Sequence, residues 1–142
     1  MEASSKRKFK IGDFVNWTNS NGVNLGKREI IGLDSRSGET YFNYTYYLSP
    51  TDTPWFSIAE NELEDYETYV KDVRNMTFIK TSDISAISIE KLFKNLKVRK
   101  KINGVFDVIY YNHNSEEETK IAKLKANEIA KFINGYYGLT KA

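Results

Sequence analysis

Short runs of alternating hydrophobic and polar residues fill the first half of the chain, and clusters of Asn, Asp, Ser and Gly separate them. This pattern predicts three strands, over residues 11–18, 27–33 and 39–48. In the third strand, Tyr46 and Leu48 fall on one face. A short closing strand over residues 55–58 follows a loop whose prolines exclude a central strand. The pattern predicts a small β-barrel over residues 9–66, behind a basic tail at residues 1–8.

Three stretches of this half, KFKIGDFVNW, EIIGLD and WFSIAENELE, resemble SH3-like barrels of the KOW and Tudor type. Such barrels often begin with a GD-x-V strand and end with an aromatic-x-hydrophobic pattern followed by acid-x-x-Leu. The resemblance covers about residues 8–65 and implies a fold alone, since SH3-like barrels have many unrelated functions. The chain is also similar to small uncharacterised proteins of phages and mobile elements, in which an ending like PTDTPWF recurs.

The adjacent aromatic residues Trp55 and Phe56 have two interpretations. Neighbouring residues of a strand point to opposite sides, so only one of the two can enter a barrel core. The favoured interpretation places one of them in the core beside Ile58, with a turn over residues 60–63 seating Leu63. In the alternative, the other aromatic residue lines an exposed groove with Tyr69 and an acidic rim that includes Asp65. The partner-binding residues of that groove are Trp55, Glu60, Glu62, Glu64 and Tyr66.

The second half of the chain, residues 70–136, predicts an antiparallel sheet packed by one C-terminal helix, and the resemblance does not extend into it. Residues 76–80 predict a strand. Residues 83–91 also predict a strand, with a helix as the alternative because Ile84, Ile87 and Leu92 fit one helical face. The whole chain is therefore expected to be α+β and mostly β, an SH3-like barrel followed by this small sheet and helix.

The sequence LKVRKKINGVFDVIYY predicts a hairpin with a two-residue loop at Asn103-Gly104, because both loop positions require positive φ. A two-residue loop places Ile102 opposite Val105 and sets the register of the pair. One face of the predicted pair is nearly apolar. The other face carries cations and aromatic rings, contributed by Lys97, Arg99, Lys101, Phe106 and Tyr110.

A helix is expected to begin at Ser115, where Ser115 and Glu118 form a capping box. An apolar stripe that includes Ile129 and Ile133 continues along it. Asn134-Gly135 is expected to end this helix with a left-handed residue.

Charge is unevenly distributed along the 142 residues, although the net charge is only +2. Residues 34–70 contain one basic and eight acidic residues, and residues 71–103 contain nine basic and three acidic residues. Such asymmetry suggests two surfaces with different partners, or two halves that attract each other or a second copy of the chain. The basic N-terminus is not followed by an apolar segment of signal-peptide length, and no apolar run is long enough to span a bilayer. We therefore expect a soluble, cytoplasmic protein.

Catalytic signatures are absent from the sequence. The chain has no cysteine, and its single histidine, His113, lies in a polar connection. No glycine-rich phosphate loop precedes a helix. The acids at residues 60–67 are more typical of a solvated face than of a catalytic pair. We expect no enzyme activity, no cofactor and no metal.

The remaining functional class is binding. We expect a small non-enzymatic protein that occupies a protein partner, such as an accessory protein of a phage or mobile element or an inhibitor of host defence. The abundance of Asn, Lys, Ile and Tyr is typical of an AT-rich genome. The alternative is nucleic-acid binding by the cations and rings of the hairpin at residues 96–111. That surface would be extended by Lys6, Arg7, Lys8, Lys10, Lys91 and Lys94.

Overall fold

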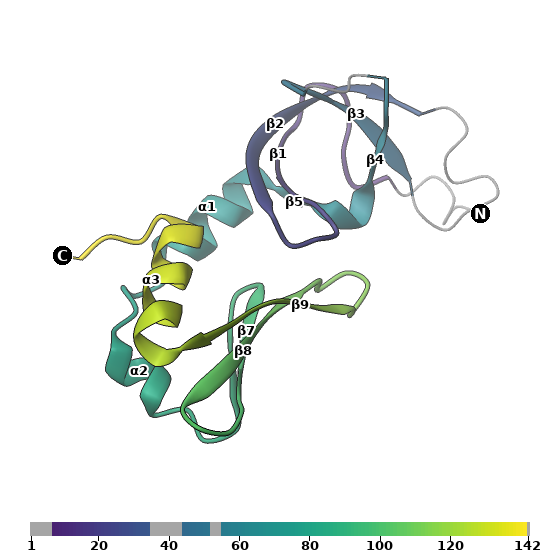
Figure 1. The fold of residues 1–142 in the computed structure, drawn as a ribbon. Helices are drawn as coiled ribbons and strands as arrows, with labels where there is room; N and C mark the ends of the chain where they lie inside the picture. Colours follow the sequence, from purple (N-terminus) through teal and green to yellow (C-terminus); the bar gives the residue numbers. More distant parts are fainter. Residues whose placement is uncertain (1–6, 35–43, 52–54, 142) are drawn as a thin grey trace. The chain divides into compact units, whose positions relative to one another are not determined.

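The chain divides into two compact units in the computed structural model, which describes residues 7–34, 44–51 and 55–141 (Figure 1). The first unit contains residues 7–19 and 23–69, and the second contains residues 20–22 and 70–141. The architecture is α+β and mostly β, as predicted.

The first unit is a curled antiparallel sheet of five strands in the order β4-β3-β2-β1-β5 (Figure 1). Its elements are β1 (Phe14–Thr18), β2 (Asn24–Leu33), β3 (Thr45–Ser49), β4 (Ile58–Ala59), the 3₁₀ helix η2 (Glu60–Glu62) and β5 (Leu63–Asp65). Because β1 pairs with both β2 and β5, the last strand of the first unit lies beside its first strand. The three predicted strands are confirmed with somewhat different bounds, and residues 39–43 lie outside the described residues.

Six buried side chains form the core of the first unit: Phe9, Val15, Ile30, Tyr46, Leu48 and Leu63. Tyr46 and Leu48 share one face of β3 as predicted, and that face is buried. Leu63 is buried directly after the turn at residues 60–62, also as predicted. The predicted closing strand is wrong at its start, because β4 contains only Ile58 and Ala59.

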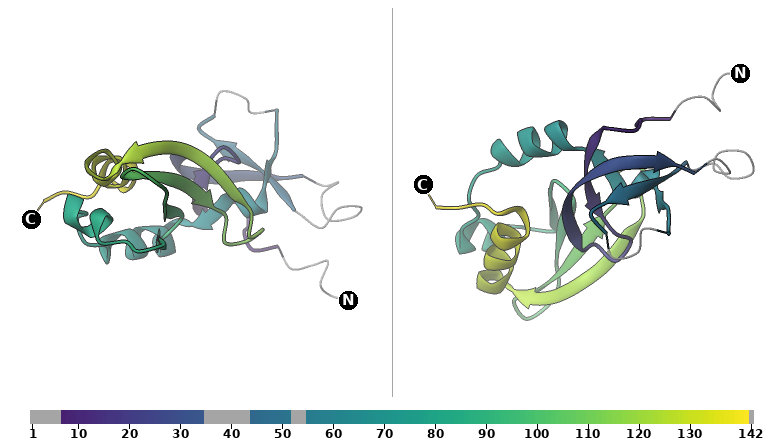
Figure 2. Two further views of the ribbon diagram at one scale, coloured as in Figure 1. Left: turned by 60° about the horizontal axis from the view of Figure 1, so that its bottom comes forward. Right: turned by 90° about the horizontal axis from the view of Figure 1, so that it is seen from above.

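The second unit is an antiparallel sheet of four strands in the order β6-β7-β8-β9. Its strands are β6 (Glu90–Phe93), β7 (Leu96–Lys100), β8 (Val105–Tyr111) and β9 (Glu118–Lys125). Helix α1 (Tyr66–Arg74) leads into this unit, and α2 (Thr81–Ser85) and α3 (Ala126–Tyr137) lie side by side (Figures 1 and 2).

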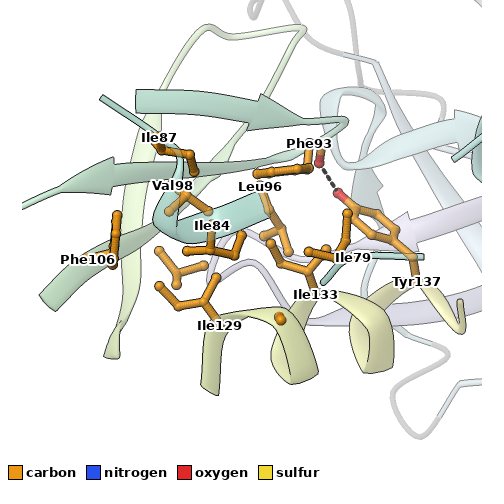
Figure 3. Packing of buried hydrophobic residues seen from close by; sticks show 12 residues of the cluster. Ile79, Ile84, Ile87, Phe93, Leu96, Val98, Phe106, Ile129, Ile133 and Tyr137 are labelled. Atoms are coloured by element: carbon orange, nitrogen blue, oxygen red, sulfur yellow. Dashed lines mark hydrogen bonds between the residues drawn. The ribbon is translucent and has the colours of Figure 1, made fainter. Parts of the chain in front are cut away.

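The core of the second unit lies between its sheet and its helices. Ile129, Ile133 and Tyr137 recur every four residues on α3, so they share one helical face, and that face packs toward Leu96 and Val98 (Figure 3). The Tyr137 hydroxyl donates a hydrogen bond to the backbone carbonyl of Phe93 at 2.8 Å. The helix therefore covers the sheet as predicted.

The predicted start and end of this helix are wrong. The segment after Ser115 forms β9, whose backbone groups pair with β8. The helix begins after Lys125, whose backbone N–H donates to the carboxylate of Glu128 at 3.0 Å. It ends at Gly138, which has a φ of 68°, and Gly135 lies inside it. Strand pairing along eight residues outweighs the local capping signal at Ser115.

Two other predictions from local patterns are also wrong. Residues 83–91 do not form one strand, because α2 occupies the beginning of this range and β6 starts at its end. Residues 76–80 belong to no strand. Within them, the Ile79 backbone N–H and C=O bond to the side-chain amide of Asn134, at 2.8 and 2.9 Å. A side chain thus supplies the hydrogen bonds that a neighbouring strand would otherwise supply.

Candidate interaction surfaces

Trp55 and Phe56 both lie on the surface of the first unit. Their side chains are 66% and 60% exposed, and their ring centroids are 6.1 Å apart. The favoured sequence interpretation, in which one of them enters the core, is therefore wrong. The core is filled by other residues, with Trp17 and Ile58 packed against it.

The acids at residues 60–62 bind side chains of their own unit. The Tyr46 hydroxyl donates to the Glu60 carboxylate at 2.5 Å, and Trp17 Nε1 donates to the Glu62 carboxylate at 3.0 Å. Burial raises the pKa of Tyr46 to about 12, and the hydrogen bond to Glu60 contributes, because it stabilises the neutral phenol. These acids support the barrel, and a partner would have to compete with these contacts.

The tyrosines of the predicted groove are half-buried and engaged. Lys27 Nζ lies 4.8 Å from the ring centroid of Tyr66 and 4.6 Å from that of Phe14. Asn24 donates to the Tyr69 hydroxyl at 2.6 Å, and burial raises the pKa of Tyr69. Glu64 is also half-buried, in β5. Of the five predicted groove residues, Trp55 alone is classed as exposed.

The end of the predicted basic tail binds the first unit. The Arg7 guanidinium donates to the backbone carbonyls of Thr45 and Asp34, at 3.1 and 2.9 Å. The Lys8 backbone N–H donates to the Glu60 carboxylate at 3.1 Å. Residues 1–6 lie outside the described residues.

The predicted register of the hairpin is wrong by one residue. Asn103 and Gly104 have positive φ as predicted, 59° and 71°. However, the loop contains three residues, 102–104, because the Lys101 backbone N–H bonds to the Val105 carbonyl at 2.9 Å. Lys100 therefore pairs with Phe106, where the prediction placed Lys101 opposite Phe106. A slip of one residue exchanges the faces of one strand relative to the other.

This register separates the cations of the predicted nucleic-acid surface from its rings. Phe106 and Tyr110 lie in the buried part of the second unit, 3% and 6% exposed. Lys97 and Arg99 lie on the opposite face, so base stacking and phosphate contacts cannot come from one surface as predicted. The three-residue loop is the physical reason for this correction.

The cations of that opposite face pair with two acids. Lys97 Nζ lies 2.6 Å from a carboxylate oxygen of Glu118, and Arg99 Nε lies 2.9 Å from one of Glu90. The hydrogen bond from Arg99 lowers the pKa of Glu90, and that from Lys97 lowers the pKa of Glu118. Lys101 Nζ lies 3.9 Å from the buried carboxylate of Asp107. We call Lys97, Arg99, Glu90 and Glu118 the paired face.

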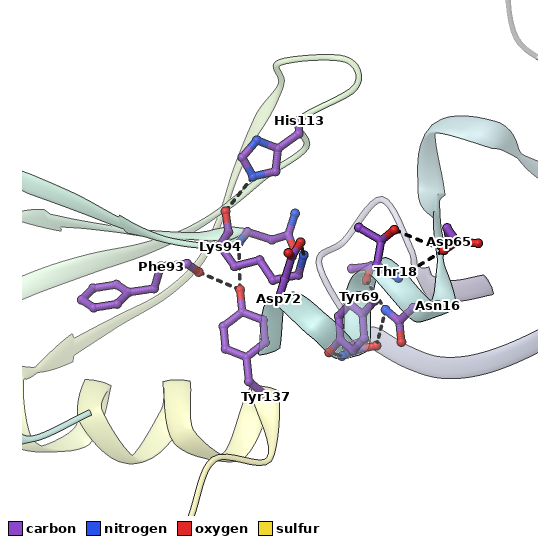
Figure 4. A network of polar contacts seen from close by, with 12 residues as sticks. Asn16, Thr18, Asp65, Tyr69, Asp72, Phe93, Lys94, His113 and Tyr137 are labelled. Carbon is purple, nitrogen blue, oxygen red and sulfur yellow. Dashed lines mark hydrogen bonds and ion pairs between the residues drawn. The ribbon is translucent and has the colours of Figure 1, made fainter. Parts of the chain in front are cut away.

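The single histidine has a structural contact. His113 Nε2 lies 2.6 Å from the backbone carbonyl oxygen of Lys94, whose ammonium lies 3.0 Å from Asp72 (Figure 4). Across residues 7–34, 44–51 and 55–141, no three His, Cys, Asp or Glu side chains gather as a metal site. Within the same residues, no helix is long and apolar enough to cross a membrane.

One further surface, at the hairpin end of the second unit, was not predicted from the sequence. A hollow of about 770 Å³ lies there between the hairpin loop, the residues before β6 and β9. The signal in the sequence is Ile102 beside Asn103-Gly104. The predicted two-residue loop paired Ile102 with Val105 in the sheet, so the exposure of Ile102 was not expected.

Comparison with known proteins adds no assignment: the chain matches no protein-family model, no curated protein and no solved structure.

Proposed function

We propose that this chain is a non-enzymatic binding protein that acts by occupying the surface of a protein partner, with Trp55 and Phe56 at the centre of the contact. The observation that carries this proposal is the exposure of both rings, 66% and 60%, at adjacent positions. Each aromatic side chain can bury about 150–250 Å² in an interface. Tryptophan is also among the residues that most often dominate binding energy.

The charge of residues 34–70 suggests the chemistry of the partner. Residues 34–70 contain eight acids and one basic residue. Asp65 and Glu67 are exposed, and complementary charge increases the rate of association and selects among partners. The partner is therefore a protein with an apolar pocket surrounded by Lys and Arg. The similarity to small proteins of phages and mobile elements supports an accessory protein of that kind, including one that inhibits host defence. The abundance of Asn, Lys, Ile and Tyr, which is typical of an AT-rich genome, supports the same class.

The test compares wild-type protein with a Trp55→Ala/Phe56→Ala double variant in capture from the native host, followed by affinity measurement with the captured protein. Ile11→Ala is the matched control, because Ile11 is an apolar side chain of the same unit that is 59% exposed. The double variant should bind about 100-fold more weakly, as expected for two dominant interface residues. Ile11→Ala should bind like wild type.

Two results would contradict this proposal. One is equal affinity of the double variant and wild type for the captured protein. The other is tight binding to an oligonucleotide that weakens steeply with salt, which would favour the alternative of nucleic-acid binding.

A further inference from the structure

The hollow at the hairpin end of the second unit is held by backbone hydrogen bonds. The Lys100 N–H donates to the Ile89 carbonyl at 2.7 Å, which ties the residue before β6 to the end of β7. The loop is closed by the hydrogen bond of Lys101 to Val105 at 2.9 Å. The hollow is lined by Ser88, Ile89, Lys100, Lys101, Ile102, Asn103, Val105 and Lys123.

Two isoleucines give this hollow its apolar character. Ile89 and Ile102 are 73% and 79% exposed, and Val105 is half-buried beside them. Single exposed apolar residues are common on protein surfaces, but here two line one concavity. Both are branched at Cβ, so few rotamers are available and little side-chain entropy is lost when a partner covers them.

The charges of the hollow all have one sign. Its lining includes Lys100, Lys101 and Lys123 and no acidic residue. In the part of the chain that the structure describes, no carboxylate forms an ion pair with Lys100 or Lys123. The hollow thus differs from the paired face, where each cation has a carboxylate within hydrogen-bond distance.

We propose that this hollow binds an acidic segment of a partner protein, in which an aliphatic or large apolar side chain is flanked by Asp or Glu. The apolar side chain would contact Ile89 and Ile102, and the carboxylates would pair with Lys100 and Lys123. No aromatic side chain lines the hollow, so it offers no stacking platform for nucleic-acid bases. It is also concave, whereas a membrane-binding surface projects its apolar residues into the bilayer. This surface is independent of the one proposed around Trp55.

The test begins with selection of a displayed library of short random peptides on the full chain. Counter-selection uses a Lys100→Glu/Lys123→Glu double variant. The peptides that survive should combine Asp or Glu with Leu, Ile, Phe or Trp. Fluorescence anisotropy of one labelled, synthesised peptide then gives the dissociation constant for each variant.

Three variants measure separately how much the lysines, Ile102 and the overall charge contribute to peptide affinity. Lys100→Glu/Lys123→Glu should weaken binding by about tenfold or more, because two attractive contacts become repulsive. Ile102→Ser should weaken it by about fivefold through lost apolar contact. Lys131→Glu reverses one charge at an exposed residue of α3, which is half of the double variant's change in net charge, and it should alter binding by less than about twofold. All three changes are at exposed positions, and thermal melting verifies that each variant is folded.

Several outcomes would overturn the proposal. Enrichment of neutral or basic peptides would do so, as would equal binding of the selected peptide to the double variant and to wild type. An effect of Lys131→Glu as large as that of the double variant would mean general charge attraction. Binding to single-stranded oligonucleotide or to phosphatidylserine vesicles that is tighter than peptide binding, and is lost in the double variant, would assign the lysines to those ligands.

Discussion

Charge is concentrated in two segments of the chain, the acidic residues 60–69 of the first unit and the basic residues 94–101 of the second. The two segments differ in how many of their charges contact other residues of the same unit. In the acidic segment, Glu60 and Glu62 accept hydrogen bonds from aromatic side chains of their own unit. These carboxylates therefore stabilise the first unit. A protein partner could bind them only by replacing these internal hydrogen bonds.

In the basic segment, some of the cations pair with acids of the second unit and others do not. Lys97 and Arg99 pair with acids of β6 and β9, whereas Lys100 lies one residue further on, at an apolar hollow that contains no acid. A run of like charges thus becomes a candidate binding surface only where the fold leaves those charges without local partners. The following variants test this difference, from the largest expected effect to the smallest.

The largest effect on stability should come from Phe106, whose ring the register of β7 and β8 places in the core of the second unit. Phe106→Ala should lower the free energy of unfolding by about 3–5 kcal/mol, because Phe106 is buried and its loss leaves a cavity. Ile102→Ala, at a side chain that is 79% exposed, should change it by less than about 0.5 kcal/mol. Urea unfolding measures both values. Similar values for the two variants would contradict the three-residue loop.

The next effect concerns Tyr46, which is buried and donates a hydrogen bond to Glu60 of the acidic segment. The pKa of Tyr46 is about 12 in the folded state and 10.0 in an ordinary tyrosine, so the folded state holds this proton more tightly. The resulting stability is complete below pH 10 and is lost as pH rises toward 12. At about 1.4 kcal/mol per pKa unit, the loss is about 2–3 kcal/mol.

Tyr46→Phe removes this titrating group, so its free energy of unfolding should decline less than that of wild type over the same pH range. Urea unfolding at a series of alkaline pH values measures the difference between the two proteins. Parallel curves would show that Tyr46 does not keep its proton in the fold.

A smaller effect is expected at the hairpin loop, which presents the hollow. Gly104→Val should destabilise the second unit by about 1–2 kcal/mol, because a β-branched residue is strained at a φ of 71°. Space is not the cause, since a Cβ atom at Gly104 would meet no atom within 4 Å. Gly135→Ala provides a control at a glycine inside α3, where φ is helical and alanine is favoured. Unchanged thermal melting of Gly104→Val would contradict the loop conformation.

The smallest effect should come from a variant that removes the acids of the paired face and leaves its cations without them. Glu90→Gln/Glu118→Gln removes both carboxylates that contact Lys97 and Arg99. Affinity for a single-stranded oligonucleotide should rise about threefold to tenfold and become more salt-dependent. Anisotropy titrations at two salt concentrations measure this change. Glu116→Gln/Glu117→Gln, with the same change in net charge at exposed positions, should have less effect.

The features that the sequence predicted correctly depend on near neighbours. The alternation in β3 buries Tyr46 and Leu48, and the Asn103-Gly104 pair has positive φ. Both follow from backbone geometry within a few residues. The broad division into a strand-rich first half and a sheet with a C-terminal helix follows from the same local patterns.

The features that it missed depend on distant partners. Residues 118–125 fit a helical stripe, but pairing with β8 makes them a strand. Ile79 lies in an apolar run, but the amide of Asn134 takes the place of a neighbouring strand. Of the candidate sites, the exposed Trp55 was predicted as the alternative, whereas the hollow beside Ile102 required the loop length, which local patterns do not determine.

The three-residue loop makes Ile102 dispensable for the architecture. Since Lys101 already pairs with Val105 through its backbone, deleting Ile102 would join those two residues through Asn103-Gly104 alone, the commonest type of hairpin connection. The strand pairs from Leu96–Tyr110 to Lys100–Phe106 would be retained. The Val105 N–H would lose its acceptor, the Ile102 carbonyl at 3.3 Å, and the hairpin would lose one exposed apolar side chain. Deleting Ile102 would thus remove one side chain of the proposed binding hollow and keep the pairing of β7 with β8. A single-residue deletion would therefore test the proposed ligand contact separately from the turn.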